Sequence, residues 1–439
     1  MSTGTPRNHV IDVARALSVI VVVVFHTLLY RISIVDGAVT LIPWAAPSWL
    51  YPLTWVLMIM PLFFVAGGFA NALTVDRMRR EGTGLGHYLA GRGHRLVGPL
   101  SVFVTFCAVI FTAAAWLGWL GAAVELSRQL MQLLWFITVY LVIVALAPWL
   151  VRLHDAYGVW PMIAMAVVAA AVDAWSFHVG RPEIRNLNMI VVWPLVHQFG
   201  IAYQRGWWRS GSRWAAPTAI LLGVTGVVFL VFVAGYPPTS VGFADIPFAN
   251  LQPPTVAMAS LALAQCGVLA LIERAGWLAH LSGRTERLIG VLNAVMMSVY
   301  LWHIPCIAVA GAGLLLLTAL LPSLAGIMLS PPVLALAALA VVAAVVPLLG
   351  QLELRMIPPL GPTQDTAGAI MAYGTLVLGT LLVWQYGTVL HPTRVGSSLG
   401  VVLIWVGSWL MGHAADRTQA AHRTGRAFLR ARDDRNGRT

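Results

Sequence analysis

The chain contains no lysine, few charged residues and few cysteines. Charged residues make up only 10% of its 439 residues, whereas soluble domains carry about 25%. Hydrophobic residues make up 59% and are spread along the whole length, which excludes a soluble enzyme with one membrane anchor. The apolar runs are continuous and do not alternate with polar residues, which argues against an outer-membrane barrel. We therefore expect an all-α, polytopic transmembrane helical bundle.

The three cysteines, Cys107, Cys266 and Cys306, all lie inside apolar segments. They form no CxxC pair and no disulfide framework, so we interpret them as small buried side chains. The histidines show no ligand spacing such as HExxH. We therefore expect no metal site and no permanently bound cofactor.

The net charge of +11 comes from arginine alone. The arginines gather in short loops between apolar runs and in the last 25 or so residues, a pattern typical of the positive-inside rule. The charge therefore indicates a lipid bilayer as partner and not nucleic acid. It predicts a multi-pass protein of a bacterial cytoplasmic (inner) membrane with both termini in the cytoplasm. The absence of lysine beside abundant alanine, valine and arginine is typical of GC-rich bacterial genomes.

A membrane span needs about 20 mostly apolar residues, and the chain offers about twelve such runs. They are 13–35, 50–73, 96–120, 131–151, 159–178, 187–204, 214–235, 255–273, 289–318, 333–352, 368–390 and 397–413.

The first run carries ionisable residues that a simple anchor would not need. In IDVARALSVIVVVVFH, residues 11–26, Arg15 and His26 are eleven residues apart. Eleven helical steps end about 20° past three full turns, so both side chains face the same way, about 16 Å apart. Asp12 lies three residues before Arg15 and joins this stripe. Such residues usually face a cavity or a partner. The alternative is a structural histidine with an arginine that snorkels to the interface.

The first helix resembles the opening helix of the acyltransferase 3 family of membrane O-acyltransferases, where Asp-x-x-Arg-Ala begins an Arg-x10-His spacing. Five further segments resemble motifs of that family in the same order: PLFFVAGGFANAL at 61–73, AGRGHRLVGPL at 90–100, LWFITVYLVIVALAPWL at 134–150, VYLWHIP at 299–305 and QLELRMIPP at 351–359. Gly67 replaces a serine of the family pattern, and Met296 and Met297 replace a Ser-Tyr pair.

The resemblance implies transfer of an acyl group from cytoplasmic acyl-CoA, with acetyl-CoA as the default, to a hydroxyl group. We expect the acceptor to be a carbohydrate or glycolipid of the cell envelope. The resemblance also implies an acyltransferase membrane domain over 1–359 with about ten helices. Two additional transmembrane helices over 360–413 and a basic cytoplasmic tail over 414–439 lie outside it.

The resemblance also assigns expected roles to residues. His26 is expected to act as general base or to accept the acyl group itself, with Arg15 as its catalytic neighbour oriented by Asp12. Arg92 and Arg95 are expected to bind the phosphates or thioester of acyl-CoA. Supporting roles are expected for Glu353, Tyr300, His303 and Trp135.

Two of these expectations keep a structural alternative. His303 is equally compatible with a structural hydrogen bond, and Tyr300 with simple packing instead of stacking on a sugar ring. Asp173 and His197 are further polar residues in apolar surroundings without a counterpart in the family motifs. They are expected either to set acceptor specificity or to pair with other buried groups.

The main alternative function is a twelve-helix secondary transporter of the major facilitator type. The loop VDRMRRE at 75–81 is similar to the Asp-Arg-x-Gly-Arg-Arg motif of those transporters, although Arg79 replaces its glycine. No second copy of the motif follows the eighth run, and no long central loop divides the chain. A transporter also leaves the Arg-x10-His helix unexplained.

Overall fold

The computed structural model describes residues 8–35, 38–43, 47–243, 245–246, 248–356 and 365–412. The predicted basic tail lies outside these residues. The chain forms two compact units. We call Met1–Leu73 with Leu146–Pro347 the first unit, and Thr74–Ala145 with Leu348–Thr439 the second unit. Each unit is described by itself.

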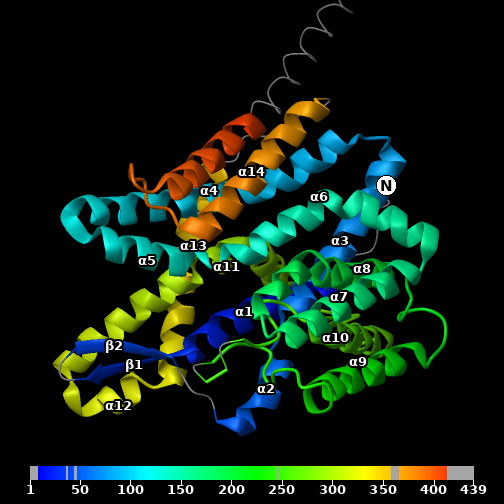
Figure 1. Ribbon diagram of the computed structural model, residues 1–439, viewed down its shortest axis with the longest axis horizontal. Helices are drawn as coiled ribbons and strands as arrows, with labels where there is room; N and C mark the ends of the chain where they lie inside the picture. Colours follow the sequence, from blue (N-terminus) through cyan, green and yellow to red (C-terminus); the bar gives the residue numbers. More distant parts are fainter. Residues whose placement is uncertain are drawn as a thin grey trace, which may run out of the picture. The chain divides into compact units, whose positions relative to one another are not determined.

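The first unit contains the beginning of the chain and most of its central helices (Figure 1). Its elements are α1 (His9–Leu28), β1 (Tyr30–Val35), β2 (Ala38–Pro43), η1 (Ser48–Leu50), α2 (Tyr51–Val56), α7 (Trp160–Val179), η3 (Pro182–Ile190), α8 (Val192–Gln204), α9 (Ala215–Phe232), α10 (Val256–Arg274), α11 (Gly283–Leu320), η4 (Pro322–Leu324) and α12 (Ala325–Met328).

Three long helices, α3 (Met60–Glu81), α6 (Leu134–Tyr157) and α13 (Pro331–Met356), have residues in both units. The second unit also holds α4 (Leu85–Ala114), the π-helical turn η2 (Ala115–Trp119), α5 (Leu120–Met131), α14 (Thr366–Tyr386) and the helix Val395–Gly412. Gly118 in η2 has a φ of 98°, which glycine adopts without strain, and there the chain turns from α4 into α5.

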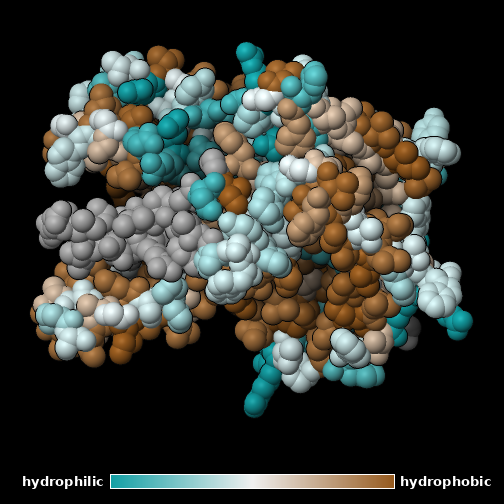
Figure 2. Space-filling view, turned by 60° about the horizontal axis from the view of Figure 1, so that its bottom comes forward, coloured by the Kyte–Doolittle hydropathy of each residue, from teal (hydrophilic) through white to brown (hydrophobic). Residues whose placement is uncertain are grey.

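Eleven helices among the described residues are long and apolar enough to cross a membrane. Figure 2 shows brown, apolar side chains over much of the visible face. The exposed large apolar side chains include Val109, Leu117, Phe232 and Leu336, from four different helices. Such a surface is stable only in contact with lipid. The polytopic transmembrane bundle predicted from composition is confirmed.

The sixth predicted run, 187–204, forms η3 and the short, buried α8, and it still traverses the first unit. Asn188 is joined through Asp173 to the backbone N–H of Val256, at the start of α10. Tyr203 donates a hydrogen bond to Glu273, at the end of α10. Seventeen helical steps separate Val256 from Glu273, a rise of about 26 Å. The η3–α8 segment therefore covers the depth of α10.

The direction of α1 and α11 supports this additional crossing. Asn293 contacts Asp12 near the start of α1, and His303 contacts His26 near its end. The two helices therefore run parallel. Only six of the eleven candidate spans lie between them in the chain, and six crossings would leave them antiparallel. A seventh crossing, by η3 and α8, makes them parallel.

The helix directions within the second unit agree with this result. Gly86 on α4 lies against Thr366, and Gly93 lies against Tyr373, so α4 and α14 also run parallel. Six candidate spans again lie between them, and again a seventh crossing is required. Eleven candidate helices and the η3–α8 segment together give the twelve crossings expected from the sequence.

The first span is shorter than predicted. It ends at Leu28 instead of residue 35, and the chain continues into a hairpin of β1 and β2 that pairs Val35 with Ala38. Between these two residues the sequence reads Asp36-Gly37, a favoured two-residue hairpin loop, and β-branched residues flank it. The hairpin signal therefore outweighs the apolar run that favoured a longer helix.

Candidate functional site

Local interactions fix the start of α1, the helix that carries the polar stripe. The side chain of Asn8 caps the helix by accepting a hydrogen bond from the backbone N–H of Ile11, 3.0 Å away. Asp12 in the first turn places a negative charge at the positive end of the helix dipole. The valines that follow have an apolar surface suited to lipid and neighbouring helices, so the helix continues to Leu28.

The three polar residues of the stripe lie near the two ends of this helix. Asp12 and Arg15 are partly exposed side chains in its first two turns. His26 is also partly exposed and lies in the last turn, two residues before the helix ends. His26 lies this close to the end of the helix because α1 starts and ends earlier than the predicted run 13–35.

His26 lies against a second histidine from α11. The imidazole rings of His26 and His303 have their centroids 4.6 Å apart and their planes at 68°. His303 is fully buried. The sequence offered both histidines separately, and the packing of α1 against α11 brings them into one site.

The hydrogen bonds of the two rings assign their tautomers. Nδ1 of His26 lies 2.8 Å from the carbonyl oxygen of Val22, and Nδ1 of His303 lies 2.7 Å from that of Tyr300. A carbonyl oxygen only accepts, so each Nδ1 carries the proton and donates it. In a neutral imidazole the Nε2 atom then carries the lone pair. The site therefore presents two basic nitrogens, and Nε2 of His303 has no hydrogen-bond partner among the described residues.

Two more residues of α11 belong to this site. Tyr300 is buried and its ring centroid lies 5.8 Å from that of His303. Asn293 donates hydrogen bonds to the carbonyl oxygens of Asp12, at 2.9 Å, and Ile289, at 3.0 Å. Asn293 was not among the residues predicted from the sequence. Its only signal there is a single amide side chain in an otherwise apolar run.

The residues predicted to bind acyl-CoA lie on α4 in the second unit. Arg92 is partly buried, donates a hydrogen bond to Oγ1 of Thr74 at 2.7 Å, and its guanidinium carbon lies 5.9 Å from the ring centroid of Tyr88. Arg95, one helical turn further, is exposed. Arg95 is therefore the more accessible cation of the pair.

Trp135 and Glu353 also lie in the second unit. Trp135 is buried near the start of α6, next to the ring of Phe136. Glu353 is buried in the last turns of α13. The structure thus groups the predicted residues by unit: Asp12, Arg15, His26, Tyr300 and His303 belong to the first unit, and Arg92, Arg95, Trp135 and Glu353 to the second.

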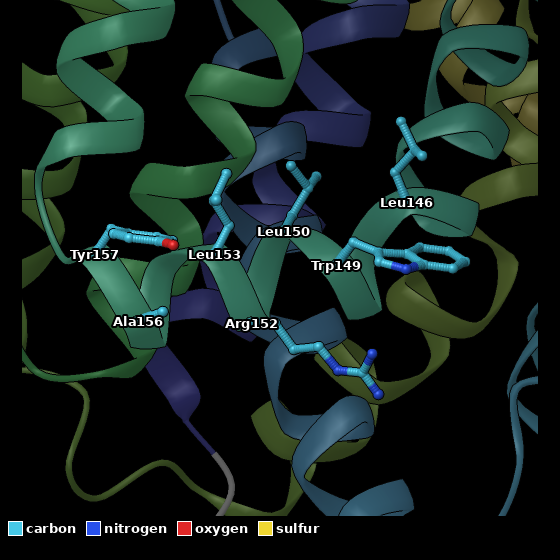
Figure 3. A pocket seen from close by; sticks show the side chains of 7 residues that line it. All are labelled: Leu146, Trp149, Leu150, Arg152, Leu153, Ala156 and Tyr157. Carbon is cyan, nitrogen blue, oxygen red and sulfur yellow. The ribbon is translucent and has the colours of Figure 1, made fainter.

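A surface pocket of about 390 Å³ lies along α6 and contains none of the predicted residues. Figure 3 shows its lining: Leu146, Trp149, Leu150, Leu153 and Tyr157 follow one side of the helix, and Arg152 extends away from them. A shallow apolar groove on a membrane helix is covered by lipid. We therefore do not place the chemistry there.

Among the described residues, no group of three or more His, Cys, Asp or Glu side chains is arranged to hold a metal ion. The chemistry that this arrangement offers is proton transfer or nucleophilic attack by neutral imidazole.

A family model described as an acyltransferase domain matches residues 8–350, which is most of the chain. No curated protein and no solved structure matches it.

Proposed function

Because the chain belongs to the acyltransferase 3 family, we propose that it transfers an acyl group from cytoplasmic acyl-CoA to a hydroxyl of a cell-envelope glycan or glycolipid. The observation that carries this proposal is the contact between His26 and His303, each with its Nδ1 bound to a backbone carbonyl. Acyl transfer to a hydroxyl needs a base or a nucleophile, and these rings offer both.

In the first of two routes, His26 acts as general base. Its Nε2 takes the proton of the acceptor hydroxyl while the oxygen attacks the thioester carbonyl carbon. A carbon–oxygen bond forms, the carbon–sulfur bond breaks, and the electron pair of that bond leaves with the CoA sulfur. The proton on His26 then passes to the thiolate, so that free CoA and an ester are the products.

In the second route, His26 is the nucleophile. Its Nε2 attacks the thioester carbonyl carbon, the carbon–sulfur bond breaks, and a cationic acyl-imidazole forms, since Nδ1 keeps its proton. CoA leaves as the thiolate and takes a proton from water. Nε2 of His303 lies in the same site and can take the proton of the acceptor hydroxyl, which attacks the acyl-imidazole. The ester forms, the acyl–nitrogen bond breaks with its electron pair returning to Nε2 of His26, and His303 then gives its proton to water. A burst of CoA release before acceptor is added distinguishes this route from the first.

The donor side of the proposal depends on charge. CoA carries several phosphate charges, and arginine binds phosphate through charge-assisted hydrogen bonds. The exposed guanidinium of Arg95 is suited to this contact, and Arg92, held by Thr74, is suited to a fixed contact near the helix. We place both on the cytoplasmic side of the inner membrane, together with both termini, because arginine gathers in the corresponding loops.

The transporter alternative receives no support from the family assignment. The charged residues that resemble the transporter motif have a local explanation. Nη1 of Arg79 lies 3.9 Å from Oδ1 of Asp76, one helical turn earlier, so the two side chains form an ion pair. Positive charge at the cytoplasmic end of a span is typical of inner-membrane proteins in general and not of transporters alone.

The proposal is tested by mass spectrometry of envelope glycans and glycolipids from a deletion strain. The strain is complemented with wild type, with His26→Ala or with His280→Ala, which changes an exposed histidine outside the site. We expect a fixed acyl mass to be lost in the deletion strain. Wild type and His280→Ala should restore it, and His26→Ala should not, at equal amounts of protein in the membrane.

Two outcomes would overturn the proposal. Identical glycan profiles with and without the gene would remove the glycan acceptor. Full restoration by His26→Ala would remove His26 from the chemistry, since loss of a general base typically lowers the rate by about 10²–10⁴-fold.

A further inference from the structure

A second polar cluster of the first unit lies where α7, η3 and the start of α10 meet. At its centre is Asp173, whose side chain is fully buried. Its Oδ1 accepts a hydrogen bond from Asn188 at 2.9 Å. Its Oδ2 accepts from the hydroxyl of Tyr236 at 3.0 Å and from the backbone N–H of Val256 at 2.8 Å. The carboxylate of Asp173 is therefore fully engaged.

The local fold turns two further polar side chains inward. Gly180 ends α7 in the left-handed conformation, with a φ of 69°, and the chain then enters η3. A 3₁₀ helix has three residues per turn, so residues three apart face the same way. Arg185 and Asn188 have this spacing, and both are buried, whereas Asn186 and Leu187 between them are exposed.

Arg185 is only 2% exposed. Its Nε and Nη1 atoms are buried without a partner. The contacts that it does make are electrostatic: its guanidinium carbon lies 5.4 Å from the ring centroid of Phe177, and it is attracted by the carboxylate of Asp173. Oδ1 of Asn188, an acceptor, is likewise buried without a partner.

Buried polar groups without partners are costly, and native proteins rarely keep them without a reason. Here unused donors of Arg185 and an unused acceptor of Asn188 occur on one face of one short helix. A hydroxyl group both accepts and donates a hydrogen bond. It is the simplest ligand group that satisfies both kinds of atom at once.

An anion fits this cluster less well. A carboxylate only accepts hydrogen bonds and cannot donate to Oδ1 of Asn188, and the negative charge of either a carboxylate or a phosphate is repelled by Asp173. The charge of Arg185 is already balanced by that carboxylate. Burial and the neighbouring Asp173 raise the pKa of Tyr236, so its hydroxyl stays protonated and continues to donate to Asp173. The ligand chemistry that remains is neutral and rich in hydroxyls.

An open pocket lies beside this cluster. It has a volume of about 620 Å³ and is lined by Gly180, Arg181, Pro182, Glu183 and Ile184, the residues immediately before Arg185.

The cluster lies at the Val256 end of α10. Asn8, at the start of α1, contacts the opposite end of α10 through Glu273. His26 is about 27 Å further along α1 by helical rise, so it lies toward the same end of the first unit as this cluster.

We propose that Arg185 and Asn188 form a binding site for neutral hydroxyl groups on a non-reacting sugar of the acceptor. This inference rests on the proposed function, because it assigns a substrate class to it. The site holds the acceptor glycan, and His26 acts on a different hydroxyl of the same molecule.

The test is ligand-observed NMR, by saturation transfer, on full-length protein in lipid nanodiscs without acyl-CoA. The probes are methyl glycosides of glucose, mannose and galactose, compared with glucuronate and inorganic phosphate. We expect at least one neutral glycoside to bind wild type, with at least tenfold weaker binding in Arg185→Met. The control is Arg284→Met, which changes an exposed arginine at the start of α11, outside the cluster and its pocket, and should bind as wild type does.

Three results would overturn this site. They are no binding of any neutral glycoside, equal binding by wild type and Arg185→Met, or Arg185-dependent binding of glucuronate or phosphate in preference to the glycosides. If Arg185→Met does not fold, Arg185→Lys decides, since it keeps the charge and loses Nε and Nη1. A purely structural role predicts wild-type binding in a folded Arg185→Lys.

The same measurement separates this inference from the proposed function. Binding is observed without turnover, so a protein that binds glycosides through Arg185 and transfers no acyl group would overturn the proposed function alone. A protein whose glycan acylation depends on His26 but whose glycoside binding is unchanged in Arg185→Met would overturn this site alone.

Discussion

Asn8, the residue that caps α1, donates a hydrogen bond from Nδ2 to Oε2 of Glu273, 3.1 Å away at the end of α10. The same carboxylate accepts hydrogen bonds from the hydroxyl of Tyr203 at 2.6 Å and from Nη1 of Arg209 at 3.0 Å. Glu273 thus ties the start of the helix that carries Arg15 and His26 to two other segments of the first unit.

Glu273→Gln should therefore loosen the start of α1. The substitution removes the negative charge that Arg209 contacts and replaces one acceptor oxygen with a donor. We expect a loss of stability of about 1–3 kcal/mol, measured as a lower unfolding temperature of purified protein in detergent. Acyl transfer should fall in the same protein below its unfolding temperature, because the position of His26 depends on α1.

The control for this prediction is Glu286→Gln. Glu286 also contacts the start of α1, through His9 at 3.8 Å, but its side chain is 46% exposed. Exposed ion pairs contribute only about 0–1 kcal/mol to the free energy of unfolding. The unfolding temperature of Glu286→Gln should therefore be close to that of wild type. Equal effects of the two substitutions would contradict an anchoring role for Glu273.

His303→Asn separates a structural from a chemical role of the second histidine. The asparagine amide can keep the hydrogen bond to the carbonyl oxygen of Tyr300 that Nδ1 makes now, but it removes the basic Nε2. If the proton of the acceptor passes through Nε2, His303→Asn should be as inactive as His303→Ala, with a loss of about 10²–10⁴-fold in kcat. The measurement is acyl transfer by protein of confirmed thermal stability.

His303→Gln is the complementary variant, since its amide reaches the position of Nε2 and cannot act as a base. Wild-type turnover by His303→Asn would show that only the hydrogen bond to Tyr300 matters. His303 would then position His26 without taking part in the chemistry. That result would favour the structural hydrogen bond that the sequence analysis gave as the alternative role of His303.

Sequence patterns predicted most of the architecture, because lipid imposes a strict length on each apolar run. They also predicted the shared face of Arg15 and His26, since helical periodicity is fixed. The sequence did not predict that the first span ends at Leu28, because an apolar run and a hairpin signal overlapped there. Short local windows cannot decide between two such signals without the packing around them.

The contacts between distant segments could not be predicted in this way. The approach of His26 to His303 depends on how α1 packs against α11, and no periodicity within either helix encodes it. Asp173 was noted as a buried polar residue, but its partner Asn188 lies in the short helix η3 and its partner Tyr236 in a loop, and neither segment carries a motif. The unpartnered Arg185 could not be recognised, because a positive charge in a loop has an ordinary explanation in a membrane protein.

Arg95 and Arg92 should differ as donor-binding residues. Arg95 is exposed, and Arg92 is held by Thr74 and packed on Tyr88. We expect Arg95→Ala to raise KM for acyl-CoA by about 10-fold or more with little change in kcat, since a charged hydrogen bond contributes about 1.5–3 kcal/mol. The measurement is initial rate against acyl-CoA concentration at low and high salt.

The effect of Arg95→Ala should shrink at high ionic strength, because exposed charges are screened. Arg92→Ala should lower stability as well, since it removes the bond to Thr74. Arg284→Ala, which changes an exposed arginine at the start of α11, is the control and should leave KM unchanged. The same KM for Arg95→Ala and wild type would remove Arg95 from the donor site.

Gly68 on α3 and Gly200 on α8 lie against each other where these two helices cross in the first unit, and an added side chain has no room there. A Cβ atom on Gly200 would collide with the backbone carbonyl of Val65, which cannot move without shifting α3. We expect Gly200→Ala to lower stability by about 1–3 kcal/mol, measured as the unfolding temperature in detergent. Gly313→Ala in α11 is the matched control, because nothing lies within 4 Å of its added Cβ, and it should stabilise the helix by about 0.5–1 kcal/mol. Equal unfolding temperatures for the two variants would show that α3 and α8 are not in close contact.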